Sequence, residues 1–230
     1  MNRYMAQMRL GEIGEEGQKR LSDARILIIG CGALGSPVAM YLAGAGVGHI
    51  TIADFDTVDL SNLHRQVFYK EHEVGSKKVD CLKKNMITLN SQISVEIWDK
   101  LVTRKLLEDA GGRFNFIVDG ADNPSTTYML DAYCSKYHIP LSIAGISEWT
   151  AQIFFYSPGS ITYGEIFTQP NDNSGILPCS IAGIAGPIAA FAASIQAADV
   201  IKYLAGITTS EPSRLITANL LSNKIDIIRC

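Results

Sequence analysis

The sequence has few of the features that mark disulfide-rich, cysteine–zinc or nucleic-acid-binding proteins. Its five cysteines are scattered through 230 residues, and no two of them form a Cys-x-x-Cys pair. An odd, dispersed set argues against a disulfide framework and against a zinc site built from cysteine. An excess of one charge is also missing, since 20 basic and 23 acidic residues leave a formal net charge of −3. Nucleic acid is therefore not expected as the main partner.

Long uninterrupted apolar runs are missing too. Residues 1–24 carry charged side chains throughout, so no secretory leader is expected and the chain is expected to be cytoplasmic. The longest apolar segment, residues 181–205, is interrupted by Pro187, Gln196, Asp199 and Lys202. These interruptions favour a buried helix over a membrane span, and no membrane partner is expected.

What is present predicts one globular α/β domain, because 47% of the residues are hydrophobic and only 19% are charged. Short β-branched or aliphatic runs predict strands at 25–30, 49–54, 94–98, 114–119 and 140–144. Helical patterns lie between them, at 35–45, at 76–90 with Val79, Leu82, Met86 and Leu89 on one face, and at 124–137 after an Asn123 N-cap. This alternation predicts a Rossmann-like, mostly parallel sheet with helices on both faces.

After residue 150 the pattern changes. Residues 151–157 alternate like an exposed or edge strand, 158–180 are expected to form a long, mobile, irregular loop, and 214–229 suggest a closing antiparallel hairpin. No linker divides the chain. We therefore expect a single domain over 1–230, made of an N-terminal helical arm (1–24), a nucleotide-binding core (25–145) and a C-terminal part (146–230) that binds a partner protein.

Gly30, Gly32 and Gly35 form a Gly-x-Gly-x-x-Gly motif between the first predicted strand and helix. Glycines there allow a tight turn and close backbone approach, and a helix N-terminus favours phosphate. Asp54 ends the next strand, where a carboxylate accepts from ribose hydroxyls. The motif alone also fits glycines that serve only packing, and it leaves open an NAD-linked oxidoreductase.

The stretch that follows favours a triphosphate over NAD. Asn62 and Arg65 come soon after Asp54, and Lys78 begins the next helix. Two cations close to a phosphate loop neutralise charge as pyrophosphate leaves, whereas nothing nearby suggests a nicotinamide pocket.

Four ordered motifs now become specific: DFDTVDLSNLHRQ, GSKKV, DGADN and AGIAGPIAAFAASIQAADVIKYLAG. Together with the glycine loop they resemble the ThiF/MoeB/HesA family, the bacterial relatives of ubiquitin-activating enzymes. The resemblance implies ATP-dependent adenylation of the C-terminal glycine carboxylate of a small ubiquitin-like sulfur-carrier protein, ending in Gly-Gly, by a homodimer. A further sulfurtransferase partner is also implied. The roles implied are the phosphate loop for Gly30, Gly32 and Gly35, the ribose for Asp54, the phosphates for Asn62, Arg65 and Lys78, and Mg²⁺ for Asp122.

The chemistry is consistent with these roles. Asp122 follows a strand and precedes a helix N-terminus, a suitable place for a carboxylate that holds Mg²⁺ through waters. A carboxylate ionised at pH 7 needs no general base to attack phosphorus. Each residue also has a simpler reading: Asp122 as a neighbour of the Asn123 cap, Arg65 as a surface pair with Asp59, and Lys78 as a solvated helix residue. Asp56 and Asp119 are expected to be structural acids.

Two departures from the family limit the comparison. The first cysteine pair of the family's zinc site would fall at Tyr163 and Ile166 and the second beyond residue 230, so zinc is predicted to be absent. The family's N-terminal arginine, which reaches the partner's phosphate site, is replaced by Ala6 before Gln7, with Arg3 or Arg9 as substitutes.

Cys179 precedes the final long helix, where family members often use a cysteine in sulfur transfer or covalent carrier linkage. Its simpler reading is a small loop residue. Cys31, Cys81 and Cys134 are expected in the core. Cys179 favours a thiamine-type member; molybdopterin-type, tRNA-modifying, and non-catalytic or altered-specificity nucleotide-binding relatives remain alternatives.

Overall fold

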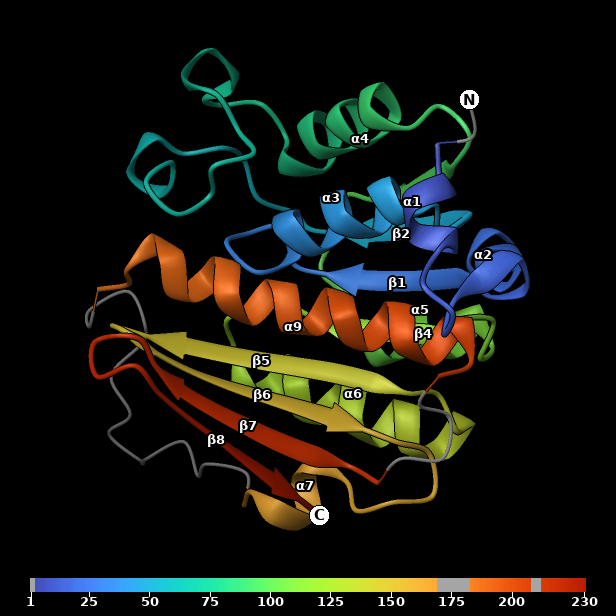
Figure 1. Ribbon diagram of the computed structural model, residues 1–230. Coiled ribbons are helices and arrows are strands. Elements are labelled where there is room, and N and C mark those ends of the chain that lie inside the picture. Colours follow the sequence, from blue (N-terminus) through green and yellow to red (C-terminus); the bar gives the residue numbers. More distant parts are fainter. Residues whose placement is uncertain (1–2, 169–182, 208–211) are drawn as a thin grey trace.

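The computed structural model describes residues 3–168, 183–207 and 212–230, and its centre is one eight-stranded sheet (Figure 1). The strand order is β3-β2-β1-β4-β5-β6-β7-β8. The first five strands are parallel and the last three join by antiparallel pairing. The strands are β1 (Arg25–Ile29), β2 (His49–Ala53), β3 (Ser94–Trp98), β4 (Phe116–Asp119), β5 (Leu141–Ser147), β6 (Thr150–Tyr156), β7 (Arg214–Asn219) and β8 (Lys224–Arg229). The α/β prediction and its antiparallel extension are confirmed.

Helices cover both faces of the sheet because the central strands are apolar on both sides. Ile28 of β1 faces a core built with α2, α3, α4 and α9, whereas its neighbour Ile29 faces a second core built with α5, α6 and α7. The helices are α1 (Met5–Met8), α2 (Gly14–Asp23), α3 (Gly35–Ala45), α4 (Lys78–Leu89), α5 (Arg104–Ala110), α6 (Pro124–Tyr137), α7 (Tyr163–Ile166) and α9 (Gly186–Ala205). Two 3₁₀ turns, η1 (Leu60–Asn62) and η2 (Glu71–Glu73), follow β2.

The prediction that residues 151–157 form an exposed or edge strand is wrong. This segment is β6, which pairs with β5 on one side and β7 on the other. Its alternation has a different cause, since only its first half, at Thr150 and Gln152, extends beyond the helices that cover the rest. The true edge is β8, whose residues are all exposed.

The long apolar helix is a core element. α9 meets the length and hydropathy of a membrane-spanning helix, but 56% of that apolar window is buried inside the protein. Its buried side packs on α3 and on β5 and β6, as Figure 1 shows. Residues 181–182, included in the expected helix, lie outside the described residues.

Three other predictions need correction. α5 was not predicted, and α7 interrupts a stretch expected to be irregular throughout. On α4, Val79, Leu82 and Met86 are fully buried, but Leu89 is 40% exposed because it lies in the last turn, at the rim of the core. The buried positions of Cys31, Cys81 and Cys134 are confirmed.

The N-terminal arm is anchored at the end of the sheet away from the glycine loop (Figure 1). Gln7 Nε2 donates to Gln18 Oε1 at 2.7 Å and to the carbonyl of Ala45 at 3.0 Å. Arg3 donates to the carbonyl of Leu89 at 2.7 Å. Because Ala45 and Leu89 are the last residues of α3 and α4, the arm lies far from the turn at which α3 begins.

Candidate active site

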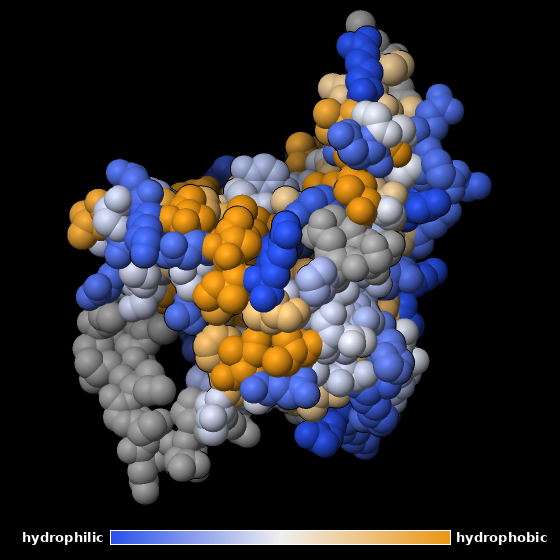
Figure 2. Space-filling model, turned by 60° about the horizontal axis from the view of Figure 1, so that its bottom comes forward, coloured by the Kyte–Doolittle hydropathy of each residue, from blue (hydrophilic) through white to orange (hydrophobic). Residues whose placement is uncertain are grey.

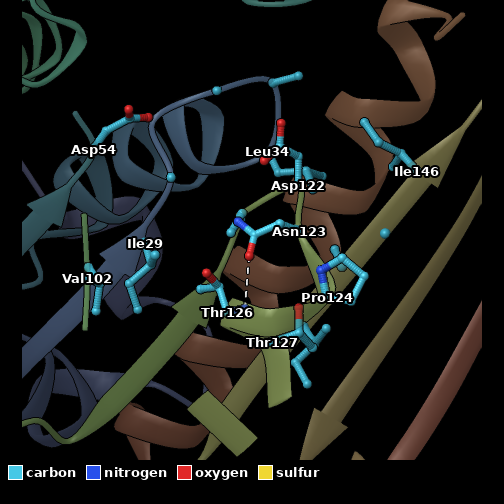
Figure 3. Close-up of a pocket in the computed structure, with 18 of the residues that line it drawn as sticks. Ile29, Leu34, Asp54, Val102, Asp122, Asn123, Pro124, Thr126, Thr127 and Ile146 are labelled. Atoms are coloured by element: carbon cyan, nitrogen blue, oxygen red, sulfur yellow. Dashed lines mark hydrogen bonds between the residues drawn. The ribbon is translucent and has the colours of Figure 1, made fainter. Parts of the chain in front are cut away.

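A cavity of about 520 Å³ opens where the central parallel strands end. It lies at the topological switch point, where the crossovers from β1 and β4 run to opposite sides, the usual ligand position in open α/β sheets. In Figure 3 the glycine loop separates Asp54 from the Asp122–Asn123 turn, and Ile146 marks the far side of the cavity. The cavity brings together Gly30, Gly32, Asp54, Arg65, Lys78 and Asp122.

The three glycines of the loop have different physical roles. Gly30 has φ +84°, and a Cβ there would lie 2.5 Å from the carbonyl oxygen of Gly120. A Cβ on Gly35 would lie 1.7 Å from the carbonyl oxygen of Gly30, so Gly35 lets α3 close onto the loop and does not itself line the cavity. Gly32 is the open one, since a Cβ there would meet only Gln66 Nε2, at 3.4 Å.

Asp54 closes the β2 side of the cavity. Its Oδ2 accepts from the backbone N–H of Cys31 at 2.6 Å, and its Oδ1 accepts from the N–H of Asp56 at 2.8 Å. The carboxylate therefore fixes the glycine loop to the end of β2 while staying partly exposed. Buried beneath it, the Cys31 thiol has a raised pKa, because burial and the nearby Asp54 charge disfavour its thiolate.

Arg65 reaches the cavity from the turn after η1. Its Nη2 donates to Asn62 Oδ1 at 2.6 Å. Asn62 does not itself line the cavity, so its clearest role is to aim Arg65. The alternative of a surface pair with Asp59 is wrong, because Asp59 accepts instead from the N–H and hydroxyl of Ser61.

Lys78 is a buried cation. Its side chain is 5% exposed, and its Nζ lies 2.9 Å from Asp56 Oδ2. The reading of Lys78 as a solvated helix residue is therefore wrong, whereas the adjacent Lys77 does fit that description, with a side chain 40% exposed. Asp56 lines the cavity as the counter-charge of Lys78, a role that its sequence position did not indicate.

The turn after β4 presents two acids with different surroundings. Asp119 is 1% exposed and accepts from the N–H of Ala121 and the hydroxyl of Thr127, which confirms it as a structural acid. Burial raises its pKa to about 6. Asp122 is exposed, lines the cavity and precedes the Asn123 cap of α6.

Gln66 is one of several polar residues of this cavity that sequence reasoning missed. It is 5% exposed, and its Oε1 has no hydrogen-bond partner among the described residues. The signal available was its position directly after Arg65, a residue already expected at the phosphates. Buried amides usually have partners, which suggests that a ligand or water completes this one.

The corner around Tyr163 is held together by aromatic packing and backbone hydrogen bonds. Tyr163 packs against Tyr128, Phe154 and Phe167, and the backbone N–H groups of Tyr163 and Gly164 donate to Asp131 at 2.9 Å each. Over residues 3–168, 183–207 and 212–230 no group of three potential metal-ligating side chains occurs. Cys179 lies outside the described residues.

The chain is similar to proteins that are named as adenylyltransferases. It is 34% identical to the ThiS adenylyltransferase of Escherichia coli, over 90% of this chain and 82% of that protein. It is also 34% identical to the adenylyltransferase and sulfurtransferase MOCS3 of Caenorhabditis briggsae, over 99% of this chain and 57% of that one. The chain thus spans about half the length of most MOCS3 relatives it matches.

Solved structures of E. coli MccB have a similar fold. The crystal structure of E. coli MccB with ATP superposes with a TM-score of 0.83 at 26% identity, covering 99% of this chain and 71% of that one. The crystal structure of E. coli MccB with MccA-N7isoASN superposes with a TM-score of 0.85 at 27% identity, covering 100% of this chain and 72% of that one. The ThiF family model matches residues 4–230. With the glycine loop, the two cations and the acids in one cavity, the chain belongs to the ThiF family.

Proposed function

We propose that the protein adenylates the C-terminal carboxylate of a small ubiquitin-like sulfur-carrier protein, using ATP and releasing pyrophosphate. The observation that carries the proposal is that one cavity holds an open phosphate loop, the cations Arg65 and Lys78, and the exposed carboxylate of Asp122. In the reaction a carboxylate oxygen bonds to the α-phosphorus, and the bond from that phosphorus to the bridging oxygen breaks. Both reactants are anions, so neutralising and aligning them lowers the barrier.

The cavity supplies these two effects with separate residues. Gly32 and the first turn of α3 cradle phosphate, and Asp54 takes the ribose. Arg65, aimed by Asn62, and Lys78 neutralise the phosphates. Lys78 exchanges its contact with Asp56 for one with the nucleotide, so its charge is satisfied both before and after binding.

The residues present fit one Mg²⁺ ion. Among the described residues no group donates a hydrogen bond to the Asp122 carboxylate, and oxygen donors are those that this ion prefers. Magnesium is commonly held by one or two carboxylates together with substrate phosphates and waters, so Asp122 suffices as the protein ligand. When bound, the ion neutralises phosphate charge beside Arg65 and Lys78.

The carrier itself docks on the C-terminal part of the sheet. β8 is an edge strand with Ile225, Ile227 and Ile228 at least half exposed, a surface that partner proteins use. Figure 2, with the β8 and α7 end turned forward, shows hydrophobic side chains gathered in the middle of this face among charged ones. The E. coli relative is named for ThiS, which supports a thiamine-type carrier.

The protein acts as a homodimer. A second groove, between α3, α4 and α9, is largely apolar and includes Tyr41, 55% exposed, and Leu89, 40% exposed. Gln7 of the N-terminal arm also lines this groove. Because the arm lies far from its own glycine loop, the exposed Arg9 serves the partner subunit's phosphates. Unchanged nucleotide affinity and turnover in Arg9→Ala would remove Arg9 from this role.

The test is ATP–pyrophosphate exchange with purified carriers. Exchange is expected with a thiamine-type carrier ending in Gly-Gly and not with the same carrier lacking both glycines. A molybdopterin-type carrier run in parallel decides the pathway. ATP-induced thermal stabilisation without exchange for any carrier would instead support a non-catalytic or altered-specificity relative. Stabilisation by NAD but not ATP would support the oxidoreductase alternative.

Cys179 acts after adenylation, in sulfur transfer or covalent carrier linkage, with a sulfurtransferase as further partner. Cys179→Ser is expected to leave pyrophosphate exchange intact and to abolish the later thiol step. Loss of exchange in this variant would contradict that assignment.

A further inference from the structure

The first three N–H groups of the glycine loop differ in their partners. The Gly30 N–H donates to the carbonyl of Ala53 at 2.8 Å, and the Cys31 N–H donates to Asp54 Oδ2 at 2.6 Å. The Gly32 N–H donates to no other group among the described residues. Because Gly32 lines the cavity, its N–H is a donor that remains available to a ligand.

The carbonyl of Cys31 is held from the side of the core by Tyr69. The Tyr69 hydroxyl donates to this carbonyl at 2.6 Å. Tyr69 is 5% exposed, does not line the cavity, and packs in the core that also contains the Cys31 side chain. Burial raises the pKa of the Tyr69 hydroxyl well above its usual range, so at neutral pH the group keeps its proton and acts as a donor.

This contact also sets the direction of the next N–H along the chain. The carbonyl of Cys31 and the N–H of Gly32 belong to one planar peptide group, and in a trans peptide they point in opposite directions. The hydrogen bond from Tyr69 holds the carbonyl toward the core. The Gly32 N–H is therefore directed away from the core, to the side of the loop on which Gly32 lines the cavity.

We infer that Tyr69 is a positioning residue for the nucleotide's phosphates, because its hydroxyl directs the Gly32 N–H toward them. The inference rests on the ATP binding of the proposed function, and it adds a residue that does not itself touch the nucleotide. Without the hydroxyl, the buried carbonyl of Cys31 loses its partner, and the peptide gains by turning toward water in the cavity. A turned peptide presents a carbonyl oxygen to the phosphates in place of an N–H, and the phosphates repel it.

Tyr69 also joins the glycine loop to the turn that carries Arg65. The Tyr69 N–H donates to the carbonyl of Gln66 at 3.1 Å, so Tyr69 belongs to the same stretch of chain as Arg65. The Gln66 side chain lies beside Gly32, since a Cβ on Gly32 would be 3.4 Å from Gln66 Nε2. The contact with Cys31 thus fixes the Arg65 turn relative to the loop, and both approach the same phosphates in one arrangement.

Isothermal titration with ATP and with adenosine, which has no phosphate, tests the inference. Tyr69→Phe keeps the ring and removes only the hydroxyl, so the variant should fold with a slightly lower Tm. Its Kd for ATP is expected to rise about tenfold, the effect of one misdirected hydrogen-bonding group. Its Kd for adenosine should stay at the wild-type value, because adenosine does not use the Gly32 N–H.

Tyr133→Phe is the matched control. Tyr133 is 4% exposed and does not line the cavity, and its hydroxyl accepts from the N–H of Gly112 at 3.0 Å. This variant therefore also loses one buried hydrogen bond between a tyrosine hydroxyl and the backbone. It should lower the Tm by a similar amount and keep the wild-type Kd for both ATP and adenosine.

The outcomes separate this inference from the proposed function. An unchanged Kd for ATP in Tyr69→Phe overturns the inference. Equal losses of ATP and adenosine affinity also overturn it, because they show that the loop as a whole has moved, and so do equal losses of ATP affinity in the two variants. Wild-type protein that binds ATP but exchanges no pyrophosphate with any Gly-Gly carrier contradicts the proposed function alone. Wild-type protein that binds no ATP overturns both.

Discussion

Lys78 Nζ lies 2.9 Å from Asp56 Oδ2, with the lysine side chain 5% exposed and the aspartate side chain 52% exposed. The pair thus joins a cation that cannot reach bulk water to an anion at the cavity mouth. A buried charge without a partner is costly, and Asp56 supplies the partner of Lys78. Under the proposed function, Asp56 therefore stabilises the nucleotide-free protein and competes with the nucleotide for Lys78.

Asp56→Asn separates these two effects. A neutral amide attracts the Lys78 ammonium less, so the nucleotide-free protein should lose about 1 kcal/mol of unfolding free energy. The same change removes a negative charge beside the phosphates, so the Kd for ATP should fall several-fold. Urea denaturation measures the first effect and isothermal titration the second.

The control for this variant is Asp99→Asn. Asp99 pairs with Lys77 at 3.0 Å, but both side chains are at least 40% exposed. Exposed pairs contribute little, so stability should change by less than about 1 kcal/mol and ATP affinity not at all. Weaker ATP binding in Asp56→Asn would contradict the competition.

The adjacent lysines give a second prediction. Lys78→Gln should lower the rate of pyrophosphate exchange by about 10²- to 10³-fold, because it removes a cation that neutralises charge in the transition state. Lys77→Gln changes the preceding residue, which does not line the cavity, and should keep a near-wild-type rate of pyrophosphate exchange. Equal losses in the two variants would show that general surface charge is responsible.

The glycine loop gives a third prediction. Gly35→Ala places a Cβ within 1.7 Å of the Gly30 carbonyl oxygen, so the protein should lose about 3 kcal/mol or fail to fold. Gly32→Ala meets only a side-chain amide at 3.4 Å, so Tm should hold while ATP affinity drops about tenfold. Normal ATP binding by a stable Gly32→Ala would mean that phosphate does not approach this backbone.

Local spacing was enough to predict the elements that carry the loop, Asp54 and Asp122, because each follows a strand end or precedes a helix start. Partners distant in sequence were not predictable in this way. Lys78 and Asp56 are 22 positions apart, and only the fold shows that Lys78 is buried and that Asp56 faces it. Asn62 was expected at the phosphates, but it does not line the cavity and instead accepts from Arg65, a contact that depends on side-chain direction.

The error at β6 has a general cause. The alternation of exposed and buried residues along a strand shows which positions other elements cover. The place of the strand in the sheet is only one cause of that burial. At Gln152 the exposure comes from the ends of α6 and α7, beyond which an interior strand is open to solvent.

Asp119 gives the last prediction, on pH. Its pKa is raised to about 6 from an ordinary value of 3.8, so the folded protein binds a proton that the unfolded chain releases. The stabilising effect of that proton is complete below pH 4 and is lost as pH rises through 6. Wild-type protein free of nucleotide and Mg²⁺ should therefore lose roughly 1 kcal/mol of unfolding free energy between pH 5 and 7 relative to Asp119→Asn.

The asparagine keeps both hydrogen bonds, since its oxygen accepts from Ala121 N–H and its amide donates to the Thr127 hydroxyl. Asp109→Asn, at an exposed position, should follow the wild type, and urea denaturation across this range measures all three. Parallel curves for wild type and Asp119→Asn would mean that the buried carboxyl is ionised throughout.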